Sequence, residues 1–205
     1  IMRSLPSVVD GLKTSQRKVL YACFKRKLRG EIKVAQLAGY VAEHTGYHHG
    51  EVSLHATIVN MAQNFVGSNN LPLLEPIGQF GTRLAGGKDS AAARYIHTRL
   101  SPVARIIFPE SDDPLLDWLE DDAEPIEPTH YVPTIPFVLI NGTRGIGTGW
   151  STAIPPHHPL EIVDAVRDRI LGSEKDASTK TPIMPWYRGF EGSIRAPSKK
   201  KFGAF

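Results

Sequence analysis

An adjacent arginine and tyrosine, Arg94 and Tyr95, are the residues of this sequence best suited to covalent chemistry. They follow three alanines and begin an aromatic and β-branched run, residues 95–98, that predicts a short strand. A tyrosine phenol is a poor nucleophile at neutral pH because its pKa is about 10. A fixed guanidinium beside it favours the phenolate and binds the non-bridging oxygens of a phosphate. The pair suits attack on a phosphodiester, although a lone Arg-Tyr is far more often a packing feature.

Such an attack also needs a proton acceptor, further cations on the phosphate and activation of the leaving oxygen. His48 and His49 are candidate acceptors, and we expect His49 to be functional and His48 structural. Arg3 is a candidate second ligand of the phosphate. Activation of the leaving oxygen usually requires a metal. The aspartates at 112–113 and 121–122 read as a solvated acidic surface, so we expect metal ligands to lie outside this chain.

The charges are distributed unevenly along the 205 residues. Residues 1–50 hold nine Lys/Arg against three Asp/Glu, whereas residues 109–130 hold no Lys/Arg and nine Asp/Glu. The basic segment suits a polyanion, and the acidic one should mark a boundary or a surface turned away from it. The candidates Lys25, Arg26, Lys27 and Arg29 are either part of the polyanion surface or a solvated face, and the sequence leaves both open.

The remaining composition narrows the class of protein. One cysteine, Cys23, excludes a disulfide framework and a cysteine zinc site, and it suits a reducing compartment. No apolar run approaches the length of a membrane span. Because the sequence opens and closes inside what reads as folded protein, we expect it to be a piece of a longer chain.

The first half of the chain reads as helices followed by a small sheet. Apolar spacing predicts helices at residues 16–27, with Ser15 as N-cap, at 34–43 and at 51–66. The second and third form a helix-turn-helix pattern, since a short Gly-containing link joins them and the third has a small polar face. Residues 67–88 are rich in Gly, Asn and Pro and predict a wing of two or three short strands.

The second half is expected to mix helix and strand. We predict helices at residues 102–108, 114–120 and 159–171, a buried strand at 136–140, and strands and loops beyond residue 171. A Gly-rich run at 141–150 follows that strand. It does not read as a nucleotide-binding loop, because no helix begins after it.

Several blocks, in order along the chain, resemble the breakage–reunion region of type IIA DNA topoisomerases, in the form found in eukaryotic DNA topoisomerase II. They lie at residues 3–20, 33–39, 47–51, 62–70, 78–83, 86–91, 94–96, 140–142 and 145–150. The resemblance implies that Tyr95 attacks DNA to form a 5′-phosphotyrosyl link, that Arg94 stabilises the transition state, and that His49 and Arg3 complete the site. It also implies DNA contacts for a further set of residues: Lys13, Arg17, Lys18, Tyr47, Ser53 and Ile146. Ile146 would wedge between base pairs, as an apolar side chain at a loop tip can do.

The same resemblance implies an α+β fold with two parts. Residues 1–106 would form a winged-helix domain carrying the tyrosine, and residues 107–205 the start of an α/β tower domain with the DNA-bending loop. The family works as a nuclear homodimer on double-stranded DNA, with no membrane involvement. Its Mg²⁺ ligands and its ATP site would lie outside this chain.

The sequence also leaves two alternative functions, each from a different class of protein. A non-catalytic architectural protein could keep the helices and bend DNA without cutting it. The set Arg3, His49, Arg94 and Tyr95 favours the enzyme, because a pure binding module does not need it. A nucleotide-dependent enzyme built on residues 142–149 is the weaker alternative.

Overall fold

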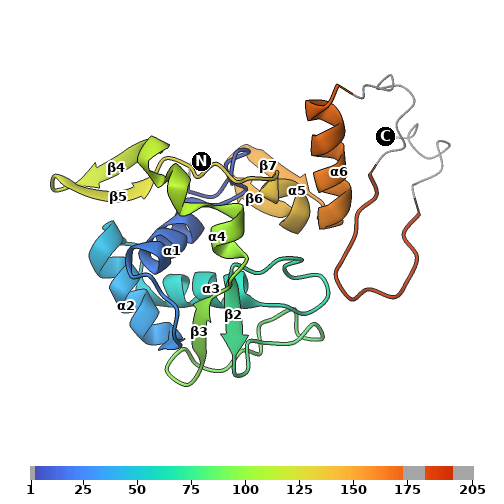
Figure 1. The fold of residues 1–205 in the computed structure, drawn as a ribbon. Helices are drawn as coiled ribbons and strands as arrows, with labels where there is room; N and C mark the ends of the chain where they lie inside the picture. The colour runs from blue at the N-terminus through green and yellow to red at the C-terminus, as the bar shows by residue number, and fades with distance from the viewer. Residues whose placement is uncertain (1–2, 173–182, 196–205) are drawn as a thin grey trace.

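The computed structural model describes residues 3–172 and 183–195 and begins with helices packed on a small sheet (Figure 1). The helices are α1 (Thr14–Lys25), α2 (Val34–Thr45) and α3 (Glu51–Ala62). The antiparallel sheet has the order β1-β3-β2, formed by β1 (Ile32–Lys33), β3 (His97–Leu100) and β2 (Leu74–Ile77). Its register places Lys33 opposite His97 and Glu75 opposite Arg99.

The apolar faces of the three helices form the core that fixes their arrangement. Val19 and Leu20 of α1, Leu37 of α2, and Leu54 and Ile58 of α3 are all buried. Side chains three or four positions apart lie on one face of a helix, which is the spacing that the sequence shows. The prediction of a helix at residues 34–43 is confirmed, and the first and third predicted helices exist with different ends.

The second half consists of short elements. They are α4 (Ala104–Ile107), the 3₁₀ helix η1 (Glu110–Leu115), β4 (Trp118–Asp121), β5 (Glu124–Pro128), α5 (Phe137–Asn141), β6 (Thr143–Gly147), β7 (Trp150–Ile154) and α6 (Pro159–Ile170). β4 and β5 form a hairpin that projects beside α1 and α2, while β6 and β7 form a second hairpin near α5 (Figure 1). The predicted helix at 159–171 is confirmed by α6.

The core continues past residue 107. Phe108, Tyr131 and Phe137 belong to the same buried cluster as the three helices. The ring of Tyr131 meets the edge of Phe24 at a centroid distance of 5.8 Å, and Phe108 lies 5.7 Å from Phe137. The segments that follow α4 therefore pack directly on the helical half.

Two predicted elements in the second half are wrong. Residues 114–120 were expected to form a helix, but η1 ends at Leu115 and β4 begins at Trp118. Trp118 places its ring 5.7 Å from that of Tyr21 and its indole N–H donates to the Asp113 carbonyl at 3.1 Å, which favours the extended backbone. Residues 136–140 were expected to be a strand and instead form α5 after Pro136. A buried apolar run of five residues does not distinguish helix from strand by its pattern.

The ends of two predicted helices also differ. The first helix begins at Thr14 rather than after Ser15, with Lys13 at the N-cap, and the Lys13 amide donates to Gln16 Oε1 at 2.9 Å. The third helix ends at Ala62 rather than at residue 66 because Gln63 turns to an extended backbone. Its side-chain amide is buried and donates to the carbonyls of Phe80 (2.8 Å) and Gly87 (3.0 Å).

In the described parts of three segments where the sequence predicted strands, at residues 67–88, 95–98 and beyond 171, the structure has fewer or shorter strands than predicted. Tyr95 lies before β3, which begins at His97, and residues 67–88 contain one strand, β2. Residues 183–195 contain no strand beyond an isolated bridge between His157 and Pro185. The predictions for residues 173–182 and 196–205 lie outside the described residues. None of the helices in the described ranges has the length and apolar character of a membrane span.

Candidate nucleic-acid interface

A groove of about 520 Å³ lies where the start of α1, the α2–α3 link and β6 meet. It gathers seven of the ten predicted site residues, together with four others. The predicted ones are Arg3, Lys13, Lys18, Tyr47, His49, Ser53 and Ile146, and the others are Ser4, Thr14, Ser15 and Arg144. Four of these side chains are Lys or Arg and none is Asp or Glu. The groove is therefore suited to a polyanion.

Arg3 and His49 meet inside this groove although they lie 46 residues apart in the chain. Arg3 Nη1 is 3.0 Å from His49 Nδ1. The same Arg3 nitrogen lies 3.3 Å from His49 Nε2, so the guanidinium contacts the imidazole ring at both of its nitrogens. The ring of Tyr47 meets that of His49 edge-on at 5.5 Å and supports its orientation. His48 is exposed and forms no hydrogen bond or ion pair with the described residues, which argues against the structural role expected for it.

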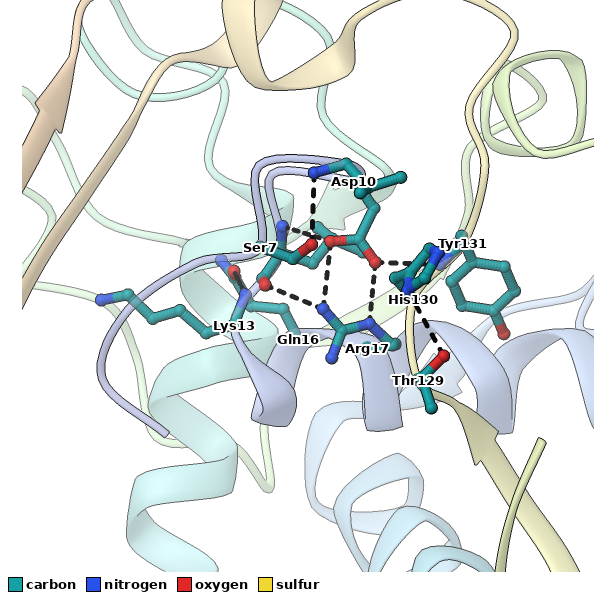
Figure 2. A network of polar contacts seen from close by, with 10 residues as sticks. Ser7, Asp10, Lys13, Gln16, Arg17, Thr129, His130 and Tyr131 are labelled. Carbon is teal, nitrogen blue, oxygen red and sulfur yellow. Dashed lines mark hydrogen bonds and ion pairs between the residues drawn. The ribbon is translucent and has the colours of Figure 1, made fainter. Parts of the chain in front are cut away.

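A buried carboxylate positions the loop that carries Arg3 and Lys13 (Figure 2). Asp10 accepts from Arg17 Nε at 2.7 Å, from Arg17 Nη2 at 3.0 Å and from the Leu12 amide at 2.9 Å. It also accepts from the Tyr131 amide at 3.0 Å, which connects the loop to the segment after β5. Arg17 is itself buried and was predicted to contact DNA. Its hydrogen bonds to Asp10 and to the Leu12 carbonyl hold the loop in place, and its DNA contact stays a prediction.

Lys18 lines the groove but its charge is already neutralised. Lys18 Nζ lies 2.7 Å from Oε1 of Glu127, which is buried in β5, and it also donates to the carbonyl of Thr45. Arg17 and Lys18 are therefore both paired with buried carboxylates, and their predicted DNA contacts stay predictions. An ion pair across 109 residues leaves no local signature, which is why the sequence did not reveal it.

The β6–β7 hairpin brings Ile146 to the groove. Ile146 is 67% exposed, whereas its neighbour Gly145 is buried against residues 4–6 of the N-terminal loop. A Cβ on Gly145 would lie 2.6 Å from the carbonyl oxygen of Ser4, so only glycine permits this contact. Arg144 lies two residues before Ile146 on the same face of the strand, and we did not predict it. The alternation of side chains along a strand is the signal that could have found it.

Arg94 and Tyr95 do not line this groove. The guanidinium carbon of Arg94 lies 4.8 Å from the centre of the Tyr95 ring, and the tyrosine side chain is 68% exposed. The backbone around them is fixed by the first turn of α2. The amide of Val34 donates to the Ile96 carbonyl at 3.0 Å, and that of Ala35 to the Ala93 carbonyl at 3.1 Å. A rigid backbone thus presents an accessible phenol and its neighbouring cation.

The loop before Tyr95 is closed by Asp89. Its carboxylate accepts from the amide of Thr82 at 2.7 Å and from the hydroxyl of Thr82 at 2.8 Å. These bonds hold the pKa of Asp89 below its usual range. A Cβ on Gly81 would lie 2.6 Å from the carbonyl oxygen of Gly87, so the two arms of the loop touch.

Two other features bear on which groups could do chemistry. Burial raises the pKa of the Cys23 thiol to about 12, so this cysteine is not a nucleophile. Within residues 3–172 and 183–195, no three His, Cys, Asp or Glu side chains are grouped so that they could hold a metal ion. That the metal ligands lie outside this chain stays a prediction.

Comparisons with known proteins identify the family of the chain. The model of the family described as DNA gyrase/topoisomerase IV, for the A-type subunit of these enzymes, matches residues 3–204. DNA topoisomerase 2 of Arabidopsis thaliana is 58% identical over 203 residues, which is 99% of this chain and 13% of that protein. The mitochondrial DNA topoisomerase 2 of Dictyostelium discoideum is 60% identical over 193 residues, 94% of this chain and 15% of that protein.

A solved structure shows the same fold. The crystal structure of the Plasmodium falciparum topoisomerase II DNA-binding, cleavage and re-ligation domain superimposes with a TM-score of 0.92 and 53% identity, covering 97% of this chain and 26% of that one. The present chain thus spans a small part of the proteins it matches. On the match of the family model and on these identities, the chain belongs to the DNA gyrase/topoisomerase IV family of A-type subunits, in the branch of the eukaryotic type II DNA topoisomerases.

Proposed function

We propose that this chain is the DNA-binding and cleavage portion of an ATP-dependent type II DNA topoisomerase. The observation that carries the proposal is the groove in which Arg3, Lys13, His49 and Ile146 come together without a single acidic side chain. Duplex DNA would lie in the groove with its phosphates on the cations, and Ile146 would enter a base step and bend the duplex. Unstacking one step costs a few kcal/mol, which the additional phosphate contacts of the bent duplex would offset.

Tyr95 would act as the nucleophile. Its phenolate oxygen attacks the scissile phosphorus, the bond to the 3′ oxygen breaks, and the product is a 5′-phosphotyrosyl link with a free 3′ hydroxyl. Arg94 lies against the ring and would stabilise the charge that develops on the phosphate. Loss of such a preorganised group typically lowers the rate by about 10²–10³-fold. His49, which lies against Arg3 in the groove, would accept or relay a proton.

One chain does not assemble all four proposed catalytic residues, because the groove that holds Arg3 and His49 does not include Arg94 or Tyr95. We therefore infer that two copies share each site, with the tyrosine of one copy next to the groove of the other. This accounts for an exposed Tyr95 on a rigid backbone. A mixture of one chain carrying Tyr95→Phe and another carrying Arg3→Ala should then regain cleavage of one strand.

The rest of the proposal concerns the longer protein. Mg²⁺ and ATP would bind to segments outside this chain, where Mg²⁺ supplies Lewis-acid activation of the leaving oxygen. Residues 1–106 would correspond to the winged-helix domain and residues 107–205 to the start of the tower domain. The site of action would be the nucleus, with the mitochondrion as the alternative that the name of one relative suggests.

An architectural role without cleavage is the second candidate, since the groove and Ile146 alone would suffice to bind and bend DNA. One experiment distinguishes the two candidate functions. The longer enzyme is incubated with end-labelled duplex and Mg²⁺ and is then denatured, and the DNA that stays attached to protein is measured. The cleavage proposal expects an attached fraction that is lost in Tyr95→Phe while DNA binding is retained. An attached fraction that persists in that variant would refute it.

A further inference from the structure

A second groove, of about 490 Å³, lies at the other end of α1. We call it the exit groove, because the last turn of α1 and the loop after it form one wall. Its apolar lining comes from Phe24, Leu28, Leu100 and Pro102. α1 has 12 residues and is about 18 Å long, so this groove is separate from the proposed DNA groove at the start of the helix. Its volume is within the range of sites that enclose a side chain or a small ligand.

The rim of the exit groove is cationic. Lys27 and Arg29 line it, both are exposed, and neither forms an ion pair with any described residue. Arg105 also lines it, but two hydrogen bonds to Asp113, at 3.0 and 3.1 Å, neutralise that guanidinium. Its flat face lies 3.5 Å from the centre of the Phe24 ring, which extends the apolar floor. Glu110 is the acidic member of the lining, so two unpaired cations face one carboxylate.

The backbone holds Lys27 in a conformation that normally belongs to glycine. Lys27 has φ 49°, directly after the C-cap of α1. The amide of Leu28 donates to the Cys23 carbonyl at 3.0 Å and that of Lys27 to the Phe24 carbonyl at 2.9 Å, which is the Schellman pattern of a helix end. Glycine is the usual residue at this position because it has no Cβ to strain. The chain carries a lysine there, and its charge lies at the rim of the groove.

We propose that the exit groove binds an acidic peptide segment of a partner protein, with one aromatic or aliphatic side chain inserted on the floor of Phe24, Leu28, Leu100 and Pro102. The peptide carboxylates would pair with Lys27 and Arg29. Charge complementarity selects an anionic partner, and the apolar floor selects a peptide over duplex DNA, whose phosphate rows carry no apolar group to fill it. This role is independent of Tyr95 and of DNA cleavage.

The test measures the anisotropy of a fluorescein-labelled peptide, Glu-Asp-Glu-Phe-Asp-Glu-Asp, with the purified 205-residue chain at one fixed salt concentration. The comparison peptide has glycine in place of phenylalanine. Because burial of a phenylalanine side chain is the main apolar gain, the glycine peptide should bind at least about tenfold more weakly. The protein variant is Lys27→Gly with Arg29→Gln, and two partly exposed ion pairs should together account for roughly a tenfold loss.

This variant keeps the fold, since glycine suits the backbone at residue 27, and its melting temperature should be unchanged or higher. Lys25→Gln is the matched control. Lys25 is exposed at the same end of α1 but does not line the groove, so its loss should change binding by less than about twofold.

Three results would overturn the proposal. Undetectable binding of the phenylalanine peptide is one. Equal losses for Lys25→Gln and for the groove variant are another, because they would indicate a general charge effect. Displacement of the peptide by short duplex DNA, with DNA binding equally sensitive to the groove variant, would assign the surface to nucleic acid instead.

Discussion

Replacement of Asp10 by alanine tests how the loop that carries Arg3 is held. The Asp10 carboxylate is fully buried and accepts four hydrogen bonds, two from Arg17 and one each from the amides of Leu12 and Tyr131 (Figure 2). The substitution leaves a buried guanidinium without its counter-ion and two buried amides without an acceptor. Loss of one partner of a buried pair costs about 3–5 kcal/mol. Because Arg17 keeps its bond to the Leu12 carbonyl, we expect about 4 kcal/mol within that range.

The assay is urea denaturation followed by circular dichroism, with the free energy of unfolding taken from the linear dependence on urea. The double variant Asp10→Ala with Arg17→Met removes the stranded charge, so it should be more stable than Asp10→Ala alone. Lys25→Ala, at an exposed position, should change the free energy by no more than about 0.5 kcal/mol. A loss below about 1 kcal/mol for Asp10→Ala, or a double variant that is no more stable than the single one, would refute the reasoning.

Three further predictions concern single side chains. Ile146→Ala should leave DNA binding largely intact but reduce bending, measured by energy transfer between dyes at the ends of a duplex. Leu160→Ala, an equally exposed aliphatic residue outside the groove, is its control, and equal bending by both variants would contradict the wedge role. The Thr82 amide resonance should titrate with a midpoint below the usual aspartate value of about 3.9, because the bonds from Thr82 stabilise ionised Asp89. The stabilisation of the loop by ionised Asp89 is complete above the usual aspartate pKa of about 3.9 and is lost as pH falls through the lowered pKa. Asp89→Asn should abolish the titration. A midpoint at the ordinary value would count against the clamp. Tyr131→Phe should raise the free energy of unfolding by about 1 kcal/mol, since its buried hydroxyl has no partner among the described residues. A clear loss of stability on urea denaturation would instead indicate a hidden hydrogen bond.

The long amphipathic helices were predictable, and the short buried elements were not. α2 and α6 show apolar faces over 12 residues each, so the period of the pattern is unambiguous. Residues 136–140 are apolar throughout, and the choice between helix and strand depends on packing with distant segments. The end of α3 at Ala62 depends in the same way on where the Gln63 amide finds its acceptors, 17 and 24 residues later.

The composition of the site was partly predictable for a similar reason. Residue types were enough to single out Arg3 and His49, and the family resemblance added Ile146; the fold brings all three into one groove. They could not show that Arg17 and Lys18 are paired with buried carboxylates, because these partners are brought together only by the tertiary fold. They also could not show that Tyr95 lies outside that groove, which is the observation behind the inference of two cooperating copies.

The most direct test of the account identifies the residue that becomes attached to DNA. The longer enzyme is trapped on DNA with Mg²⁺, denatured and digested with nuclease and trypsin, and the peptides are analysed by mass spectrometry. Trypsin cuts after Arg94 and Arg99, so the peptide Tyr-Ile-His-Thr-Arg, residues 95–99, should carry the mass of a 5′-linked nucleotide. An unmodified 95–99 peptide together with a nucleotide on any other residue, such as Tyr47, would contradict the assignment of Tyr95 as the nucleophile.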